Sequence, residues 1–81
     1  MYVTGIEVIP VTLPVEKKIR MILAIQDKTI SELAGATDQS LQNLSKKMRR
    51  GNFSEKDISL LAEALGCTVD IVFTLPDGTQ I

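Results

Sequence analysis

A short run of polar side chains near the middle of the chain carries the clearest chemistry. Ser40 is followed by Gln42 and Asn43, and each of these two amides can make paired hydrogen bonds to the edge of an adenine base. Lys46 comes four residues after Gln42, so the two lie on the same face if the segment is helical. A serine hydroxyl and a lysine ammonium can also bind a base or a phosphate, which makes this run a candidate surface for nucleic acid.

The basic residues of the chain are concentrated around this run. Although the formal net charge is -1, all nine Lys and Arg lie between Lys17 and Lys56, together with only four of the ten acids. Lys47, Arg49 and Arg50 come directly after the polar run, where they can neutralise phosphates and set affinity rather than sequence preference. A basic centre between acidic ends favours phosphate contact over an evenly solvated surface.

The composition argues against catalysis. The chain has no histidine and a single cysteine, Cys67, so it lacks a histidine general base, a zinc site of the Cys and His kind, and an internal disulfide. Its serines and aspartates fall in no nucleophile motif, and it has no glycine loop for phosphate. We therefore expect no enzyme activity, no catalytic residue, no metal and no cofactor, and we expect Cys67 to be a small apolar residue of the core.

The chain carries no signature of export or of membrane insertion. No apolar run approaches the roughly 20 residues that a membrane helix needs. The N-terminus lacks the charged start and apolar centre of a signal peptide, and one unpaired thiol suits a reducing compartment. We expect a cytoplasmic protein, and its 81 residues are typical of one domain.

Apolar spacing and capping residues predict four helices, at about residues 15–27, 30–36 and 40–50, and from Ser54 to a stop at Gly66. Thr29 and Glu32 have the spacing of a capping box at the start of the second helix. Asp38 can adopt left-handed backbone angles in the tight turn at residues 37–40. The expected core includes Leu33, Ala34, Leu44 and Ile58.

Both ends of the chain have the alternating pattern of β-structure. Residues 2–13 alternate, but Pro10 and Pro14 restrict them to an edge or irregular strand. Residues 68–75 also alternate, and they are followed by a turn at Pro76, Asp77 and Gly78 and by a short returning segment, residues 79–81. Short β segments are therefore expected at the N- and C-termini.

The stretch 15–66 resembles the phage-repressor and Cro-type helix-turn-helix family. The resemblance is carried by the sequences Thr-Ile-Ser-Glu-Leu-Ala at 29–34, Ser-Leu-Gln-Asn-Leu-Ser at 40–45, Asn-Phe-Ser-Glu-Lys at 52–56 and Leu-Ala-Glu-Ala-Leu-Gly at 61–66. It implies a mainly α, lambda-repressor-like domain of four to five helices spanning residues 1–81. In that domain the helical core covers about 15–66, and a C-terminal β segment covers about 68–81.

The resemblance also implies that the motif at about 29–50 places its second helix in a DNA major groove. In the family, residues matching Ser40, Leu41, Gln42 and Lys46 face bases, and the one matching Thr29 touches phosphate. This chain departs from the family pattern at Leu41, which is often polar there, so Leu41 either contacts a thymine methyl or is buried. With the residues argued from chemistry, the candidate DNA-binding set is Thr29, Gln39, Ser40, Leu41, Gln42, Asn43, Lys46, Lys47, Arg49 and Arg50.

These features together predict a sequence-specific DNA-binding regulator of transcription, a repressor that acts as a homodimer on double-stranded DNA. Two-fold pairing would let such a small domain read two half-sites about one helical turn apart. The alternative is an antitoxin-like or protein-interaction module, in which the C-terminal strand at 68–75 binds a partner protein by adding to a sheet. A pure interaction module has no need for the basic helix, so reversing its charge distinguishes the two.

Overall fold

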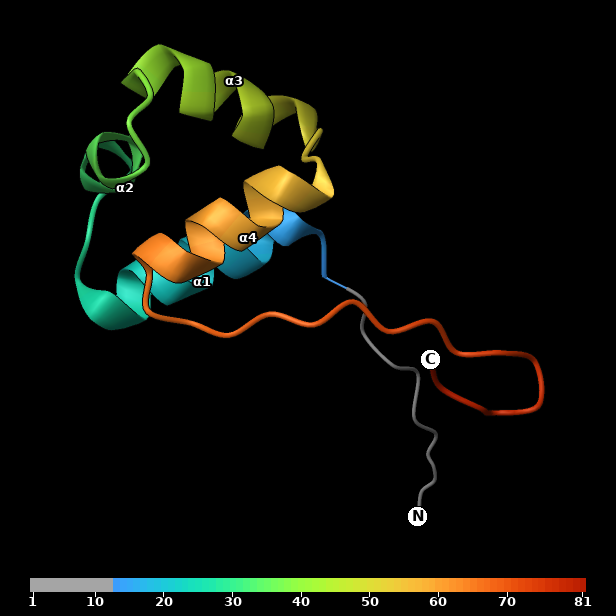
Figure 1. The fold of residues 1–81 in the computed structure, drawn as a ribbon. Coiled ribbons are helices and arrows are strands. Elements are labelled where there is room, and N and C mark those ends of the chain that lie inside the picture. Colours follow the sequence, from blue (N-terminus) through green and yellow to red (C-terminus); the bar gives the residue numbers. More distant parts are fainter. Residues whose placement is uncertain (1–12) are drawn as a thin grey trace.

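A computed structural model describes residues 13–81 of the chain, and four helices account for its regular structure: α1 (Val15–Gln26), α2 (Ile30–Ala36), α3 (Leu41–Arg50) and α4 (Glu55–Ala64). In Figure 1, α3 lies above α4, whereas α1 lies behind α4 and slightly below it. The short α2 packs against both α3 and α4. The β segment predicted at the N-terminus falls almost entirely in residues 1–12, which lie outside the described residues.

In the first half of the domain, the helices begin and end within one residue of the positions that the sequence predicts. The Thr29 hydroxyl accepts the Glu32 amide at 3.1 Å, and Oε1 of Glu32 accepts the Thr29 amide at 2.7 Å, which confirms the capping box. Asp38 adopts the left-handed conformation predicted for the turn, with φ 61°. Asp27 also does so, with φ 56°, and ends α1 one residue before the predicted limit.

The second half follows the same local rules. The Ser40 hydroxyl accepts the Asn43 amide at 3.0 Å and caps α3, and Gly51 ends that helix in the left-handed region at φ 63°. Ser54 and Asp57 form a second capping box at the start of α4. Since each cap satisfies amides that the helix itself leaves without partners, these residues fix where the helices start.

Eight buried apolar side chains form one core, drawn from all four helices and the residue after α4: Ile19, Leu23, Leu33, Ala34, Leu44, Met48, Leu61 and Leu65. No polar or charged side chain among the described residues is buried with them. The predictions for Leu33, Ala34 and Leu44 are confirmed. Ile58 is only half-buried, because it lies at the edge of the core, beside an open groove.

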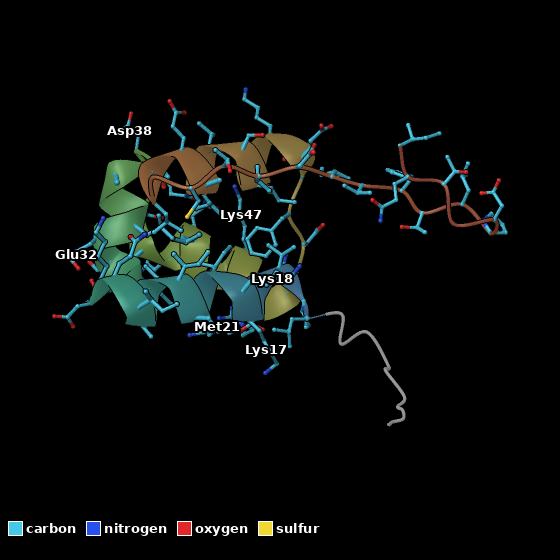
Figure 2. The ribbon with its side chains drawn as sticks, turned by 90° about the horizontal axis from the view of Figure 1, so that it is seen from below. Lys17, Lys18, Met21, Glu32, Asp38 and Lys47 are labelled. Atoms are coloured by element: carbon cyan, nitrogen blue, oxygen red, sulfur yellow. The ribbon has the colours of Figure 1, made fainter. Side chains whose placement is uncertain are left out.

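This groove, of about 510 Å³, lies between α1 and α4 and is lined mainly by apolar residues, with residues 67–71 along it. Its walls include Val15, Ile19 and Ile22 from α1 and Ile58 from α4. Figure 2 looks at this side of the domain, with α1 and α4 next to each other and the C-terminal segment running over α4. A fifth helix, the upper limit of the prediction, does not occur in residues 13–81. The chain after Gly66 is rich in β-branched residues and leaves α4 as an extended segment instead.

The predicted C-terminal β segment is wrong as a regular strand. Residues 67–73 have no regular secondary structure, and a single antiparallel bridge joins Thr74 to Gln80. The turn itself is present, because the Leu75 carbonyl accepts the Gly78 amide at 2.9 Å and Gly78 has φ 94°. A ladder needs a partner along its whole length, and among the described residues only 79–81 pair with this segment, opposite residues 73–75.

The C-terminal segment projects from the helical domain and gives the molecule its extents of 45 × 25 × 24 Å (Figure 1). Six of its large apolar side chains remain exposed: Val69, Ile71, Val72, Phe73, Leu75 and Ile81. Among the helices of residues 13–81 none has the length and apolar character that crossing a bilayer requires.

Candidate nucleic-acid interface

A chain of side-chain hydrogen bonds joins α2 to α3 across the tight turn. The Thr37 hydroxyl donates to the Leu33 carbonyl at 2.9 Å, and Nε2 of Gln39 donates to the Thr37 hydroxyl at 2.8 Å. Nδ2 of Asn43 in turn donates to Oε1 of Gln39 at 2.9 Å. The first turn of α3 is therefore held to the end of α2 by groups that lie outside the apolar core, so its direction is fixed.

The apolar residues of α3 decide which of its faces meets solvent. Leu44 and Met48 are 0% and 1% exposed, respectively, and they anchor the helix to the core. The opposite face presents the exposed side chains of Gln42, Lys46, Arg49 and Arg50. Leu41 is 46% exposed, so the buried alternative left open by the sequence does not hold.

The polar residues at the start of α3 differ in how far they are already engaged. The Gln42 side chain makes no hydrogen bond to another of residues 13–81, whereas Asn43 uses one amide hydrogen on Gln39. Ser40 uses a lone pair of its hydroxyl on the helix cap and keeps its hydrogen to donate. Gln42 thus has the full donor and acceptor capacity of an amide directed to solvent.

Lys47 lies on a different side of α3 from Gln42 and has a partner within the chain. Its Nζ is 2.8 Å from Oδ1 of Asp57 in the first turn of α4, and both side chains are half-buried. The hydrogen bond from Lys47, followed by that from the Ser54 amide, lowers the pKa of Asp57 below its usual value. The sequence does not predict this pair. Its only sign of the pair is that Asp57 occupies a capping position of the helix after α3.

Thr29 is exposed at the start of α2, but its capping box occupies both its amide and one lone pair of its hydroxyl. It can still donate its hydroxyl hydrogen to a ligand. Gln39 is half-buried and bonded at both ends of its amide. Gln39 and Thr29 are therefore better placed to position α2 and α3 than to read a ligand directly.

The cations that sequence analysis grouped together come from separate surfaces. Lys17 lies on the side of α1 that faces away from α4 (Figure 2), and Arg20 on the same helix pairs with Glu16 at 2.6 Å. On α3, by contrast, the exposed cations are Lys46, Arg49 and Arg50. Only this second group shares a helix with the free amide of Gln42.

The part of the chain that the structure describes contains no cluster of three or more His, Cys, Asp or Glu arranged to hold a metal ion. Cys67 is half-buried against the core, with its sulfur 3.7 Å from the Leu65 carbonyl. The half-buried position agrees with the expectation of a small apolar packing residue.

Comparison of the chain with models of known protein families, with curated proteins and with solved structures finds no match. Any assignment of function therefore depends on the chemistry and geometry of the residues described above.

Proposed function

We propose that the chain is a sequence-specific DNA-binding regulator, a repressor, in which α2, the turn and α3 act as a lambda-repressor-like helix-turn-helix motif. The observation that carries the proposal is the exposed polar face of α3, opposite the buried Leu44 and Met48. A major groove admits one α-helix and presents a distinct pattern of donors and acceptors at each base pair. A helix that has one apolar face in the core and one free polar face can match its polar side chains to that pattern.

Gln42 and Lys46 supply the direct readout in this proposal. The Gln42 amide pairs with an adenine edge, and Lys46, one turn further along the same face, donates to guanine or to a phosphate. The exposed Leu41 can pack against a thymine methyl. The hydrogen bond to Gln39 holds the side chain of Asn43 in one direction. Any contact that Asn43 makes with DNA therefore has a geometry that is set before binding.

In this proposal, Arg49 and Arg50 in the last turn of α3 contact the DNA backbone. Their guanidinium groups are exposed and can neutralise phosphates along the edges of the groove, which raises affinity for all sequences. Lys47 contributes differently, since its bond to Asp57 fixes α3 against α4. The proposed repressor acts as a homodimer that occupies an operator of two half-sites about one helical turn apart.

A second function, that of an antitoxin-like or protein-interaction module, is favoured by one observation. The six exposed apolar side chains of the C-terminal segment include Phe73 at 69% and Ile81 at 77%. Exposed apolar surface of this kind is typical of contact with another chain. The basic face of α3 has no role in such a module.

The test is a fluorescence-anisotropy titration against duplexes selected by the wild-type protein from a randomised pool, at two salt concentrations. One variant combines Arg49→Glu and Arg50→Glu on α3. Its matched control combines Lys17→Glu and Lys18→Glu on α1, which changes the net charge by the same amount on another surface. Lys47 is left intact in both because it has a structural partner.

We expect the α3 variant to lose measurable binding and the α1 variant to keep the selected preference, with circular dichroism showing that both retain their helices. If the wild type selects no sequence, or if both variants lose affinity equally, the proposed interface on α3 is wrong. Wild-type binding should weaken steeply with salt, by about one power of the salt concentration for each phosphate contact.

A further inference from the structure

We propose that residues 68–75 of one copy pair with the same residues of a second copy, as an antiparallel two-stranded ladder centred on Val72. The proposal deepens and rests on the homodimer of the proposed function, to which it gives a surface and a register. It does not require that DNA be bound. Its basis is the geometry of the C-terminal hairpin and the side chains that this hairpin leaves exposed.

The hairpin shows which edge of the segment is open. The Phe73 amide donates to the Ile81 carbonyl at 2.8 Å, and Phe73 accepts the Ile81 amide at 2.9 Å. The Leu75 amide donates to the Thr79 carbonyl at 2.7 Å. Since the backbone groups of successive residues in a strand point to opposite edges, those of Val72 and Thr74 point away from the returning segment.

Among the described residues, the open edge has backbone groups without a hydrogen-bond partner and exposed apolar side chains. The backbone groups of residues 68–72 make no hydrogen bond to any other residue of the described chain, 13–81. Ile71 is 48% exposed, Val72 49% and Phe73 69%. Lysine, proline or a bulge usually protects an exposed edge from pairing. Residues 68–75 contain neither lysine nor proline.

The side chains are complementary to themselves in one register. A two-fold axis requires that one residue lies opposite its own copy. With Val72 at that centre, Asp70 lies opposite the partner's Thr74, whose hydroxyl can donate to the carboxylate. On the other face of the ladder, Ile71 lies opposite the partner's Phe73. Cross-strand pairs of an aromatic with a β-branched residue are among the favourable ones.

In the neighbouring registers, the carboxylate of Asp70 lies opposite a side chain that cannot donate a hydrogen bond to it. Centring the ladder on residue 70 sets Asp70 against the partner's Asp70, which is a repulsive like-charge pair. Centring it on residue 71, 73 or 74 sets Asp70 against the partner's Val72, Pro76 or Gly78, respectively. None of these side chains can donate a hydrogen bond, and Pro76 also lacks the amide that a ladder uses.

The position of the segment suits a second copy that binds DNA at the same time. The segment leaves the domain on the side of the groove between α1 and α4, and in Figure 1 it lies below the helices while α3 lies above them. Within each copy, the paired segment therefore lies on the side of the domain away from α3. Pairing through these segments relates the two copies by a two-fold axis, which is the symmetry of an operator with two half-sites.

The experiment uses the full chain and changes one backbone amide. Cys67 allows a synthetic peptide of residues 67–81 to be ligated to residues 1–66, so that an N-methyl group can be placed on either of two amides without altering a side chain. N-methylation of Val72 blocks the central pair of the proposed ladder. N-methylation of Ile71, whose amide points to the other edge, is the matched control. Sedimentation equilibrium measures association in each case.

We expect the unmodified and Ile71-methylated proteins to be dimers at micromolar concentration. Methylation at Val72 removes both hydrogen bonds of the central pair and should weaken association by about 30-fold or more. In a dimer of mixed isotope labels, an intermolecular Overhauser effect should connect the α-protons of Ile71 and the partner's Phe73, whose Cα atoms lie about 4.5 Å apart in such a pair.

A monomeric wild type, or a dimer that is indifferent to methylation at Val72, would overturn the proposal. So would Overhauser effects that join residues 70–74 only to residues 1–12 of the same chain. The variant with Arg49→Glu and Arg50→Glu should still dimerise, and the protein methylated at Val72 should still bind a single half-site weakly. These two readouts separate a failure of the ladder from a failure of the DNA-binding proposal.

Discussion

Lys47 and Asp57 join α3 to α4 through a hydrogen-bonded ion pair, with Nζ of the lysine 2.8 Å from Oδ1 of the aspartate. The other carboxylate oxygen, Oδ2, accepts the Ser54 amide at 3.0 Å and closes the cap of α4. One carboxylate therefore both starts a helix and fixes that helix against its neighbour. The direction of the exposed face of α3 depends on this contact as well as on the core.

Replacing Asp57 with Asn should reduce stability at neutral pH and flatten its dependence on acid. Because the pKa of Asp57 is lowered in the folded state, its contribution is fully present above the unfolded-state pKa, about 4. The contribution is lost as pH falls through the lower folded-state pKa. Urea unfolding between pH 2 and pH 7 should show a higher free energy of unfolding for the wild type than for the variant at neutral pH. This difference should disappear in the acid range. A constant difference across that range would contradict the assigned role.

Leu44 and Leu41 on α3 offer a matched pair for the core. Leu44→Ala removes a fully buried side chain and should cost about 2–5 kcal/mol. Leu41→Ala removes the same atoms from an exposed position and should change the free energy of unfolding by about 0.5 kcal/mol or less. Denaturant titrations of both variants give the comparison. Equal losses would mean that Leu41 is buried in solution.

The turn between α2 and α3 can be tested at Asp38, which has φ 61°. Asp38→Ala forces a side chain with no local polar compensation into the left-handed region and should cost about 1 kcal/mol. Asp38→Gly relieves the strain but adds freedom to the unfolded chain, so we expect little net change. For a domain of this size, a loss of about 1 kcal/mol lowers the unfolding midpoint by roughly 4–8 °C. Calorimetry distinguishes the two variants.

Gln42→Ala and Arg49→Ala separate readout from affinity in the proposed interface. The first should cost about 1–3 kcal/mol on the selected duplex and relax preference at one base position. The second should weaken binding to all duplexes and reduce the salt slope by about one. Affinities for the selected duplex and for single-base changes, each at two salt concentrations, measure both effects. An unchanged sequence preference in Gln42→Ala would remove this residue from the base-reading set.

The features that the sequence predicted well are local ones. A capping box needs only Thr29 and Glu32 at the right spacing, and a helix stop needs only Gly51 in a conformation that glycine adopts readily. The burial of Leu33 and Leu44 follows from apolar periodicity within short segments. Such signals are complete within a few residues, so no knowledge of the rest of the fold is required to interpret them.

The features that the sequence did not predict depend on contacts between segments. Lys47 has the appearance of one more cation in a basic run, and only the packing of α3 on α4 brings Asp57 to it. Ile58 has the periodicity of a core residue, but in the structure of residues 13–81 it lines the open groove between α1 and α4 and is only half-buried. Residues 68–75 have the alternation of a strand, yet a strand exists only when another segment pairs with it. For the same reason the grouping of cations in sequence did not predict that α1 and α3 present them on separate surfaces.

Every fully buried side chain in residues 13–81 lies between Ile19 and Leu65, so the segment after Cys67 adds exposed surface and almost nothing to the core. The folding core and the surface of the proposed contacts with another chain thus lie in different stretches of one short chain. Substitutions in residues 68–81 should therefore change the proposed contacts with another chain while leaving the free energy of unfolding of the helical domain almost unchanged. The same separation makes this segment a convenient place to exchange one binding sequence for another while the helical domain is kept.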